Sequence, residues 1–318
     1  MFTRWKLIKC PVPSPPQDFN FRVRPYWQSY LSLFKLHDVR LDTVRDAKEY
    51  YNRTGWVHLP AGLLRSLSLD GSRPYDDDAL CPDHGLPDNL FRGTRVSDGK
   101  KVVIKAAHMD SREYNVIRIL SSPPLRDDPM NHTIPVLEFI EVPKDRIVFI
   151  VMEQWSSQLL SGGPCYCLGS FLVAMRQCIE HVAFLHEHQI THLDISVHNI
   201  LTDYNGRYAY IDYETSQQFV GVDHPVLYNY RGTEVPPEYE REGRCNPYKV
   251  DVWALGMLIL YACKMVGHNL PDLTQLVKNM LHAVPEQRPT ASSALKSFNG
   301  MRASIPNYCL QWSCPCTP

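Results

Sequence analysis

Residues 190–216 read ITHLDISVHNILTDYNGRYAYIDYETS, and this stretch decides the fold. Two short apolar runs flank Asn205 and Gly206, and an Asn-Gly pair between apolar runs predicts a β-hairpin, because the turn requires positive φ angles. A hairpin brings the residues before its first strand close to those after its second strand. We therefore expect Asp194 and Asn199 to lie at the same edge as Asp212.

Two carboxylates and an amide at one edge form a set of hard oxygen ligands. Such ligands suit Mg²⁺ that is bound to phosphate, and one carboxylate remains to orient a hydroxyl group. An alternative is that these side chains only cap turns. The spacing of Asp194, Asn199 and Asp212, together with their apolar flanks, favours the site over the caps.

The same stretch resembles the catalytic loop and the metal-binding segment of the eukaryotic protein kinases. His192-Leu193-Asp194 stands where the family has His-Arg-Asp, Asn199 falls at the family's spacing, and Asp212-Tyr213-Glu214 stands where the family has Asp-Phe-Gly. The resemblance implies that Asp194 is the catalytic residue and that Asn199 and Asp212 hold Mg²⁺. Aminoglycoside and choline phosphotransferases are similar in this stretch, which alone implies phosphoryl transfer and leaves the acceptor open.

Three motifs further along the chain make the resemblance specific to protein kinases. The resemblance implies that Asp251 bonds the backbone of the catalytic loop and that Arg288 pairs with Glu238 as a buried ion pair. Small-molecule phosphotransferases lack these motifs, so their presence favours a protein kinase. The resemblance extends from about residue 90 to about residue 298. The motifs are Gly232-Thr233 followed by Pro236-Pro237-Glu238, then Asp251 with Trp253 and Gly256, and finally Arg288-Pro289-Thr290.

A lysine closes an apolar strand in the first half of the chain. Residues 102–105 read VVIK, which resembles the family's Val-Ala-Ile-Lys, and they follow a turn at residues 97–99 that predicts a hairpin. The resemblance implies that Lys105 holds the α- and β-phosphates of ATP, and that Glu113, in a helix over about residues 111–120, pairs with it. The alternative is a strand-end lysine whose ammonium group reaches solvent.

A second apolar run, residues 146–152, reads RIVFIVM and predicts a buried strand. It leads to Glu153 and Trp155, which stand where the family has the hinge between its two lobes. The resemblance implies that backbone groups of this hinge bond the adenine of ATP, and an ordinary strand end is the alternative. Leu201, in the first strand of the hairpin, completes the expected nucleotide-binding residues.

The chain departs from the family at four places. It has no Gly-x-Gly-x-x-Gly before Lys105, so the loop that covers the phosphates is not recognisable. Glu214 replaces a glycine and adds a carboxylate near the metal-binding residues, while Leu193 and Ser196 replace an arginine and a lysine. The segment between the last two motifs is short for the family, which predicts that a helix that docks protein substrates is missing.

The composition is that of an ordinary globular protein. The chain has 318 residues, of which 44% are apolar and 21% charged, and its net charge of −1 gives no reason to expect binding to nucleic acid or to a membrane. None of its ten cysteines forms a Cys-x-x-Cys pair, which favours reduced thiols in an intracellular, cytoplasmic or nuclear protein; zinc at Cys314 and Cys316 is the alternative. We expect neither a secretory signal nor a membrane span, since no long apolar run occurs.

These features predict an α+β protein with the two-lobed fold of the protein kinases. A small antiparallel-sheet lobe is expected over about residues 86–153, and a mainly helical lobe over about residues 156–300, whose first long helix has Ser170 as its N-cap. Residues 1–85, with a proline-rich stretch at 11–16, are expected to form an accessory segment, and residues 301–318 a tail.

The expected function is transfer of a phosphoryl group from ATP, with Mg²⁺, to Ser or Thr hydroxyl groups of a protein substrate whose identity the sequence leaves open. Two alternatives remain. One is a pseudokinase that keeps the fold and acts as a binding scaffold or allosteric partner. The other is a small-molecule phosphotransferase.

Overall fold

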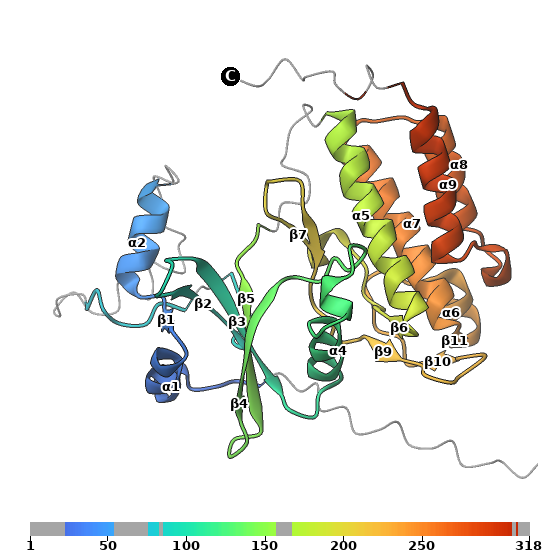
Figure 1. The fold of residues 1–318 in the computed structure, drawn as a ribbon. Coiled ribbons are helices and arrows are strands. Elements are labelled where there is room, and N and C mark those ends of the chain that lie inside the picture. The colour runs from blue at the N-terminus through green and yellow to red at the C-terminus, as the bar shows by residue number, and fades with distance from the viewer. Residues whose placement is uncertain (1–22, 54–75, 83–84, 157–166, 307–309, 311–318) are drawn as a thin grey trace, which may run out of the picture.

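A five-stranded antiparallel sheet forms the smaller of two lobes in the computed structural model, which describes residues 23–53, 76–82, 85–156, 167–306 and 310 (Figure 1). The strand order is β1-β2-β3-β5-β4. Along β5, buried residues alternate between two hydrophobic clusters, as expected for a strand covered on both faces. The strands are β1 (Val39–Leu41), β2 (Leu90–Arg95), β3 (Lys101–His108), β4 (Val136–Val142) and β5 (Ile147–Glu153).

Part of the predicted accessory segment packs on this sheet. After η1 (Trp27–Tyr30) and α1 (Leu31–Leu36), β1 pairs antiparallel with β2 and completes the sheet edge. Trp27 and Phe34 contact Phe149 of β5, with ring centroids 5.5 and 4.8 Å apart. The proline-rich stretch lies outside the described residues.

A long connection joins β1 to β2. Its described part contains α2 (Val44–Arg53) and residues 76–82, which pair with the start of α2 through backbone hydrogen bonds. The connection enters β2 at Leu90, which is the register partner of Lys105 on β3. The residue before Leu90, Asn89, accepts from the amide of Ala106 at 2.8 Å, so the connection ends next to Lys105, for which the kinase resemblance implies phosphate binding.

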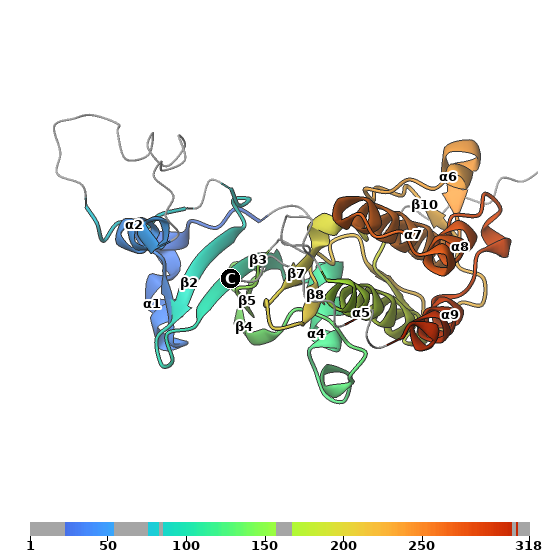
Figure 2. The same cartoon turned by 90° about the horizontal axis from the view of Figure 1, so that it is seen from above.

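Helices make up the larger lobe, in which four helices lie side by side (Figures 1 and 2). Between α7 and Arg288, a stretch described throughout, α8 is the only α-helix, as the short spacing predicts. The four helices are α5 (Leu168–Glu187), α7 (Pro247–Val266), α8 (Pro271–Met280) and α9 (Ala291–Ser304). Apart from the two strands of the hairpin described below, the other elements of the two lobes are α4 (Arg112–Leu120), η2 (Leu125–Asp127), β6 (Ile190–Thr191), η3 (Val197–Asn199), β9 (Gln217–Gln218), β10 (Leu227–Tyr228), α6 (Pro237–Glu242), β11 (Arg244–Cys245) and η4 (Pro285–Gln287).

The predicted N-cap of α5 is wrong. The cap is Cys167, whose Sγ accepts a hydrogen bond from the amide of Ser170 at 3.4 Å, so Ser170 lies inside the helix. At the other end of the lobe, α9 continues to Ser304, and the first residues of the segment predicted as a tail belong to this helix. Most of that segment lies outside the described residues.

The predicted hairpin is confirmed. β7 (Ile200–Thr202) pairs antiparallel with β8 (Tyr208–Tyr210), and Gly206 in the turn has a φ angle of 87°. The hairpin also joins the two lobes, because the amide of Tyr210 donates to the carbonyl of His132, before β4, at 2.7 Å.

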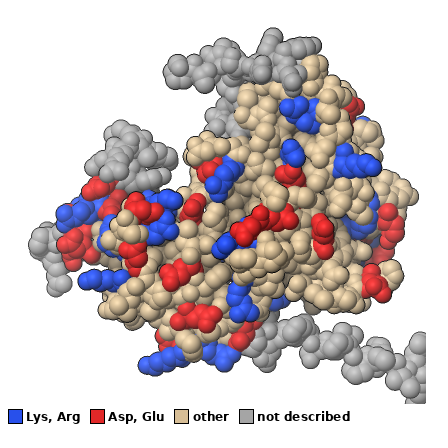
Figure 3. All heavy atoms as spheres, viewed as in Figure 1, with Lys and Arg blue, Asp and Glu red and all other residues tan. Residues whose placement is uncertain are grey.

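The predicted two-lobed α+β fold is confirmed, with α4 lying between the sheet and the helical lobe (Figure 1). Among the described helices, α5 is long and apolar enough to cross a membrane, but 61% of its most apolar window is buried inside the protein, which fits a core helix. Figure 3 shows positive and negative side chains interspersed over one face of the molecule.

Candidate active site

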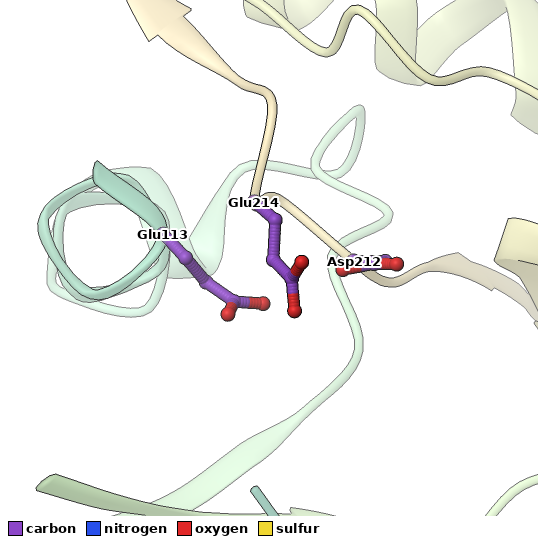
Figure 4. A group of neighbouring side chains, drawn as sticks. All are labelled: Glu113, Asp212 and Glu214. Carbon is purple, nitrogen blue, oxygen red and sulfur yellow. The ribbon is translucent and has the colours of Figure 1, made fainter. Parts of the chain in front are cut away.

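Three carboxylates surround the ammonium group of Lys105. Its Nζ lies 2.7 Å from Oε1 of Glu113, 3.0 Å from Oδ1 of Asp212 and 3.0 Å from Oε1 of Glu214. Figure 4 shows that Glu113 comes from α4, whereas Asp212 and Glu214 come from the segment after β8. These four residues, called the Lys105 cluster below, join the two lobes. The structure thus brings Lys105 together with Glu113 and Asp212, as the sequence predicts.

Local structure fixes the two residues from the smaller lobe. Glu113 lies in the first turn of α4, where negative charge interacts favourably with the helix dipole. The Oγ of Ser111 caps this turn by accepting from the amide of Tyr114 at 3.1 Å. Lys105 lies inside the sheet and is 8% exposed, so its ammonium group depends on protein partners.

Burial and charge act in opposite directions on this cluster. Burial lowers the pKa of Lys105, but the three carboxylates outweigh burial and raise it overall. Burial, together with the charges of Asp212 and Glu214, raises the pKa of Glu113 to about 7 against the opposing effect of Lys105. At Asp212 the neighbouring ammonium outweighs burial, and the pKa is lowered. The cluster therefore holds more negative charge than one lysine neutralises.

The donor set of the cluster fits a divalent cation such as Mg²⁺. One carboxylate oxygen from each of Glu113, Asp212 and Glu214 lies within 4.8 Å of the other two. Carboxylate oxygens are the ligands that Mg²⁺ and Ca²⁺ prefer, and a cation would offset the excess negative charge.

Asp194 and Asn199 are tied to one another and to the metal-binding segment. The Nδ2 of Asn199 donates to Oδ2 of Asp194 at 2.9 Å and to the Asp194 carbonyl at 2.8 Å. The carbonyl of Asn199 accepts from the amide of Ile211, the residue before Asp212, at 3.0 Å. The predicted catalytic residue and both predicted metal ligands therefore lie on two adjoining segments.

A buried aspartate holds the catalytic loop in place. Asp251, which is fully buried, accepts from the backbone amides of His192 at 2.9 Å and Leu193 at 2.8 Å, and it contacts Nε2 of His186 at 3.0 Å. Hydrogen bonds to a charged acceptor are stronger than neutral ones. This is the contact that the kinase resemblance implies for Asp251.

The loop before α6 closes on Asp194. The amide of Thr233 donates to Oδ1 of Asp194 at 2.7 Å. A Cβ atom at Gly232 would overlap the carbonyl oxygen of Leu193 and the hydroxyl of Tyr230. Only glycine therefore allows the loop to approach the catalytic loop this closely.

Tyr213 fixes the segment that carries Asp212 and Glu214. Its ring is fully buried, and its hydroxyl lies 2.9 Å from Nε2 of His181 on α5 and 3.1 Å from Oγ1 of Thr133. The Nδ1 of His181 accepts from a backbone amide at 3.0 Å, so this network assigns the proton to Nε2, which donates to Tyr213. The phenylalanine of the family cannot make these bonds.

The hinge residues lie at the end of β5. The indole Nε1 of Trp155 donates to Oε2 of Glu153 at 3.0 Å, and the guanidinium of Arg207 lies 4.9 Å from the indole ring centroid. Trp155 lines a pocket of about 500 Å³ between α5 and β8, which no residue of the Lys105 cluster lines. Leu201 is partly buried against the main hydrophobic cluster. The binding of ATP by these hinge residues and Leu201 stays a prediction.

Two features of the site are missed by sequence reasoning. Glu214 is recognised only as a departure from the family, although a carboxylate two residues after Asp212 is a signal that could have placed it in the cluster. His181 carries a weaker signal, a buried histidine on the apolar side of α5.

Comparisons with known proteins agree with this geometry. A profile of the protein kinase domain family matches residues 90–269. The chain is 24% identical over 228 residues to serine/threonine-protein kinase PAK 1 of Mus musculus, covering 66% of this chain and 39% of that protein. It is 24% identical over 270 residues to serine/threonine-protein kinase pim-2 of Danio rerio, covering 70% of this chain and 84% of that protein.

The family match covers more than half of the chain, and the chain belongs to the protein kinase family. A shorter similarity, 29% identity over 102 residues, links it to the probable serine/threonine-protein kinase KKQ8 of Candida glabrata, covering 30% of this chain and 13% of that protein. The chain thus spans well under two thirds of the length of KKQ8 and of PAK 1.

Proposed function

We propose that this chain is an ATP-dependent kinase that transfers the γ-phosphoryl group of ATP to Ser or Thr hydroxyl groups of proteins. The observation that carries the proposal is the contact of Lys105 with Glu113 and Asp212. The residue before Asp212 bonds the carbonyl of Asn199, whose side chain bonds Asp194. Family membership supports kinase activity in general. The preference for Ser and Thr rests on the names of the similar proteins.

In this proposal each residue has one task. Lys105, positioned by Glu113, holds the α- and β-phosphates, and Asp212 and Asn199 hold Mg²⁺, which neutralises phosphate charge when bound. Asp194 orients the acceptor hydroxyl and accepts its proton late in the reaction. Catalysis is then mainly positioning and stabilisation of charge, so the loss of either metal ligand is severe.

The adenine of ATP is proposed to lie against the hinge. Backbone groups at Glu153 and Trp155 bond its edge, and Leu201 contacts the ring. Backbone hydrogen bonds hold the hinge and support this role: the amide of Glu153 donates to the carbonyl of Pro135 and that of Gln154 to the carbonyl of Lys101, both at 3.1 Å.

The test is transfer of radiolabelled phosphate from ATP to a library of Ser, Thr and Tyr peptides and to small hydroxyl compounds. The proposal expects label on Ser or Thr peptides with the wild type, and none with Asp212→Asn. Label confined to small molecules, or no transfer by a chain that binds ATP with Mg²⁺, contradicts it.

A binding scaffold without catalysis is the second candidate. It is favoured by the three carboxylates around Lys105, because a phosphate group must compete with all of them. The missing glycine-rich motif points the same way. Failure of the wild type to bind ATP would support the scaffold.

A further inference from the structure

Glu214 is the member of the Lys105 cluster that the family pattern does not supply, since the family has glycine at this position. Its Oε1 lies 3.0 Å from Nζ of Lys105, as close as the oxygen of Asp212. The buried ring of Tyr213 fixes the backbone between Asp212 and Glu214, so both side chains start from a defined position. The contact of Glu214 with Lys105 is therefore built into the fold.

This contact adds a third carboxylate to the partners of Lys105. Its Nζ donates hydrogen bonds to Glu113 at 2.7 Å and to Asp212 at 3.0 Å, and Glu214 lies 3.0 Å away as an ion-pair partner. A phosphate oxygen that approaches Lys105 must therefore compete with three carboxylates. In this respect the cluster differs from a site in which the lysine has only the family's glutamate and aspartate as partners.

The three carboxylates do not give way equally. The side chain of Glu113 is 5% exposed and is held by the capped first turn of α4. The side chains of Asp212 and Glu214 are 38% and 32% exposed, so water or a ligand can reach them. Asp212 and Glu214 are therefore the partners that a ligand displaces from Lys105.

A nucleotide and a divalent cation act on these two carboxylates in opposite ways. ATP alone adds negative charge to a cluster that already has three carboxylates and one ammonium group, and it is repelled. A divalent cation is attracted by the same oxygens, and it offsets both the carboxylates and the phosphates. A cation that engages Asp212 and Glu214 leaves the donors of Lys105 available to phosphate.

We propose that Glu214 makes ATP binding depend on a divalent cation: it occupies Lys105 in the empty site and turns to the cation when cation and ATP bind together. The inference rests on the proposed function, since it takes ATP as the ligand. The coupling is reciprocal, so ATP strengthens cation binding by the same factor.

Isothermal titration calorimetry on the full chain tests this coupling without relying on activity. ATP is titrated in Mg²⁺ and in EDTA, and the measured quantity is the ratio of the Kd in EDTA to the Kd in Mg²⁺. For Glu214→Gln this ratio falls at least about fivefold from the wild type, within the usual range of coupling factors. Metal-free ATP then binds more tightly, and the cation contributes less.

Glu240→Gln is the matched control, because Glu240 is exposed on α6 and its replacement changes the net charge equally. It keeps the wild-type ratio. Glu214→Gly, which restores the family residue, is the second variant and behaves like Glu214→Gln. Melting temperatures of all variants verify that they are folded.

The outcomes separate the two proposals. If the ratio falls less than fivefold from the wild type in both Glu214 variants, the role of Glu214 is overturned. If the same proteins still bind ATP in Mg²⁺, the proposed function stands. If neither the wild type nor any variant binds ATP in either buffer, both proposals are overturned.

Discussion

Arg288 and Glu238 form a bidentate ion pair inside the helical lobe. Nη1 of Arg288 lies 2.8 Å from Oε1 of Glu238, and Nη2 lies 2.6 Å from Oε2. The guanidinium also lies 4.8 Å from the ring centroid of Trp253. This pair, which the kinase resemblance implies, is confirmed and joins the start of α6 to the chain before α9.

Replacement of Glu238 by Gln should destabilise the protein strongly. It leaves the guanidinium of Arg288, which is 2% exposed, buried without its partner charge. Removing one member of a buried pair typically costs about 3–5 kcal/mol of the free energy of unfolding, which urea denaturation measures. Glu242→Gln, at an exposed pair with Arg244, is the control and should have little effect. Equal stability of both variants would contradict the role given to the buried pair.

Tyr213→Phe should lower the free energy of unfolding by about 1–3 kcal/mol, because it removes the hydroxyl that bonds Nε2 of His181 inside the protein. Urea denaturation measures the change, with Tyr228→Phe, at an exposed tyrosine, as the control. A Tyr213→Phe variant as stable as the wild type would show that the hydroxyl does not fix this segment.

Acid should destabilise the protein through His181. Burial, and then the neighbouring His132 and His192, lower the pKa of His181 well below its ordinary value of 6.5. Below about pH 6.5 the unfolded chain binds a proton that the folded protein does not, so the stability present above this pH is lost as the pH falls.

The free energy of unfolding should therefore fall between about pH 7.5 and pH 5.5, with up to about 1.4 kcal/mol per pH unit from this one group. His181→Gln should reduce the slope, whereas His224→Gln, at an exposed histidine, should keep it. An unchanged slope in His181→Gln would rule out this residue as the cause.

Asp194→Asn should reduce phosphoryl transfer by at least about a hundredfold and leave ATP binding intact, because the substitution removes the proton acceptor for the hydroxyl group. The hydrogen bond from Asn199 shows that this side chain is held in one position. Initial rates with the best peptide of the library measure the effect, and Asp223→Asn, at an exposed site, is the control. If Asp194→Asn transfers the phosphoryl group at the wild-type rate, another group accepts the proton of the acceptor hydroxyl.

The sequence predicts those parts of the fold that short-range patterns encode. The hairpin follows from its Asn-Gly turn, and the central strand from its continuous apolar run. The contact of Lys105 with Asp212 spans 107 positions, and it is predictable only because the motifs around both residues resemble one family.

Tertiary contacts decide what the sequence does not predict. β1 has only three residues, and its pairing with β2 depends on a long connection that carries no register signal. Cys167 replaces Ser170 as the cap of α5 because the thiol also accepts a hydrogen bond from the backbone. The position of Glu214 follows from the contact of Tyr213 with His181 on another element. Binding of ATP and Mg²⁺, the preference for Ser or Thr, and the intracellular location stay predictions.

The measurement that tests the central claim most directly is the melting temperature of the chain with millimolar ATP and Mg²⁺. If Lys105, Asn199 and Asp212 hold the nucleotide and its cation together, the wild type should melt at a higher temperature, since ligand at 100 times its Kd adds about 2.7 kcal/mol of stability. Asp212→Asn should show no rise. An unchanged melting temperature of the wild type, or an equal rise in Asp212→Asn, would contradict the account.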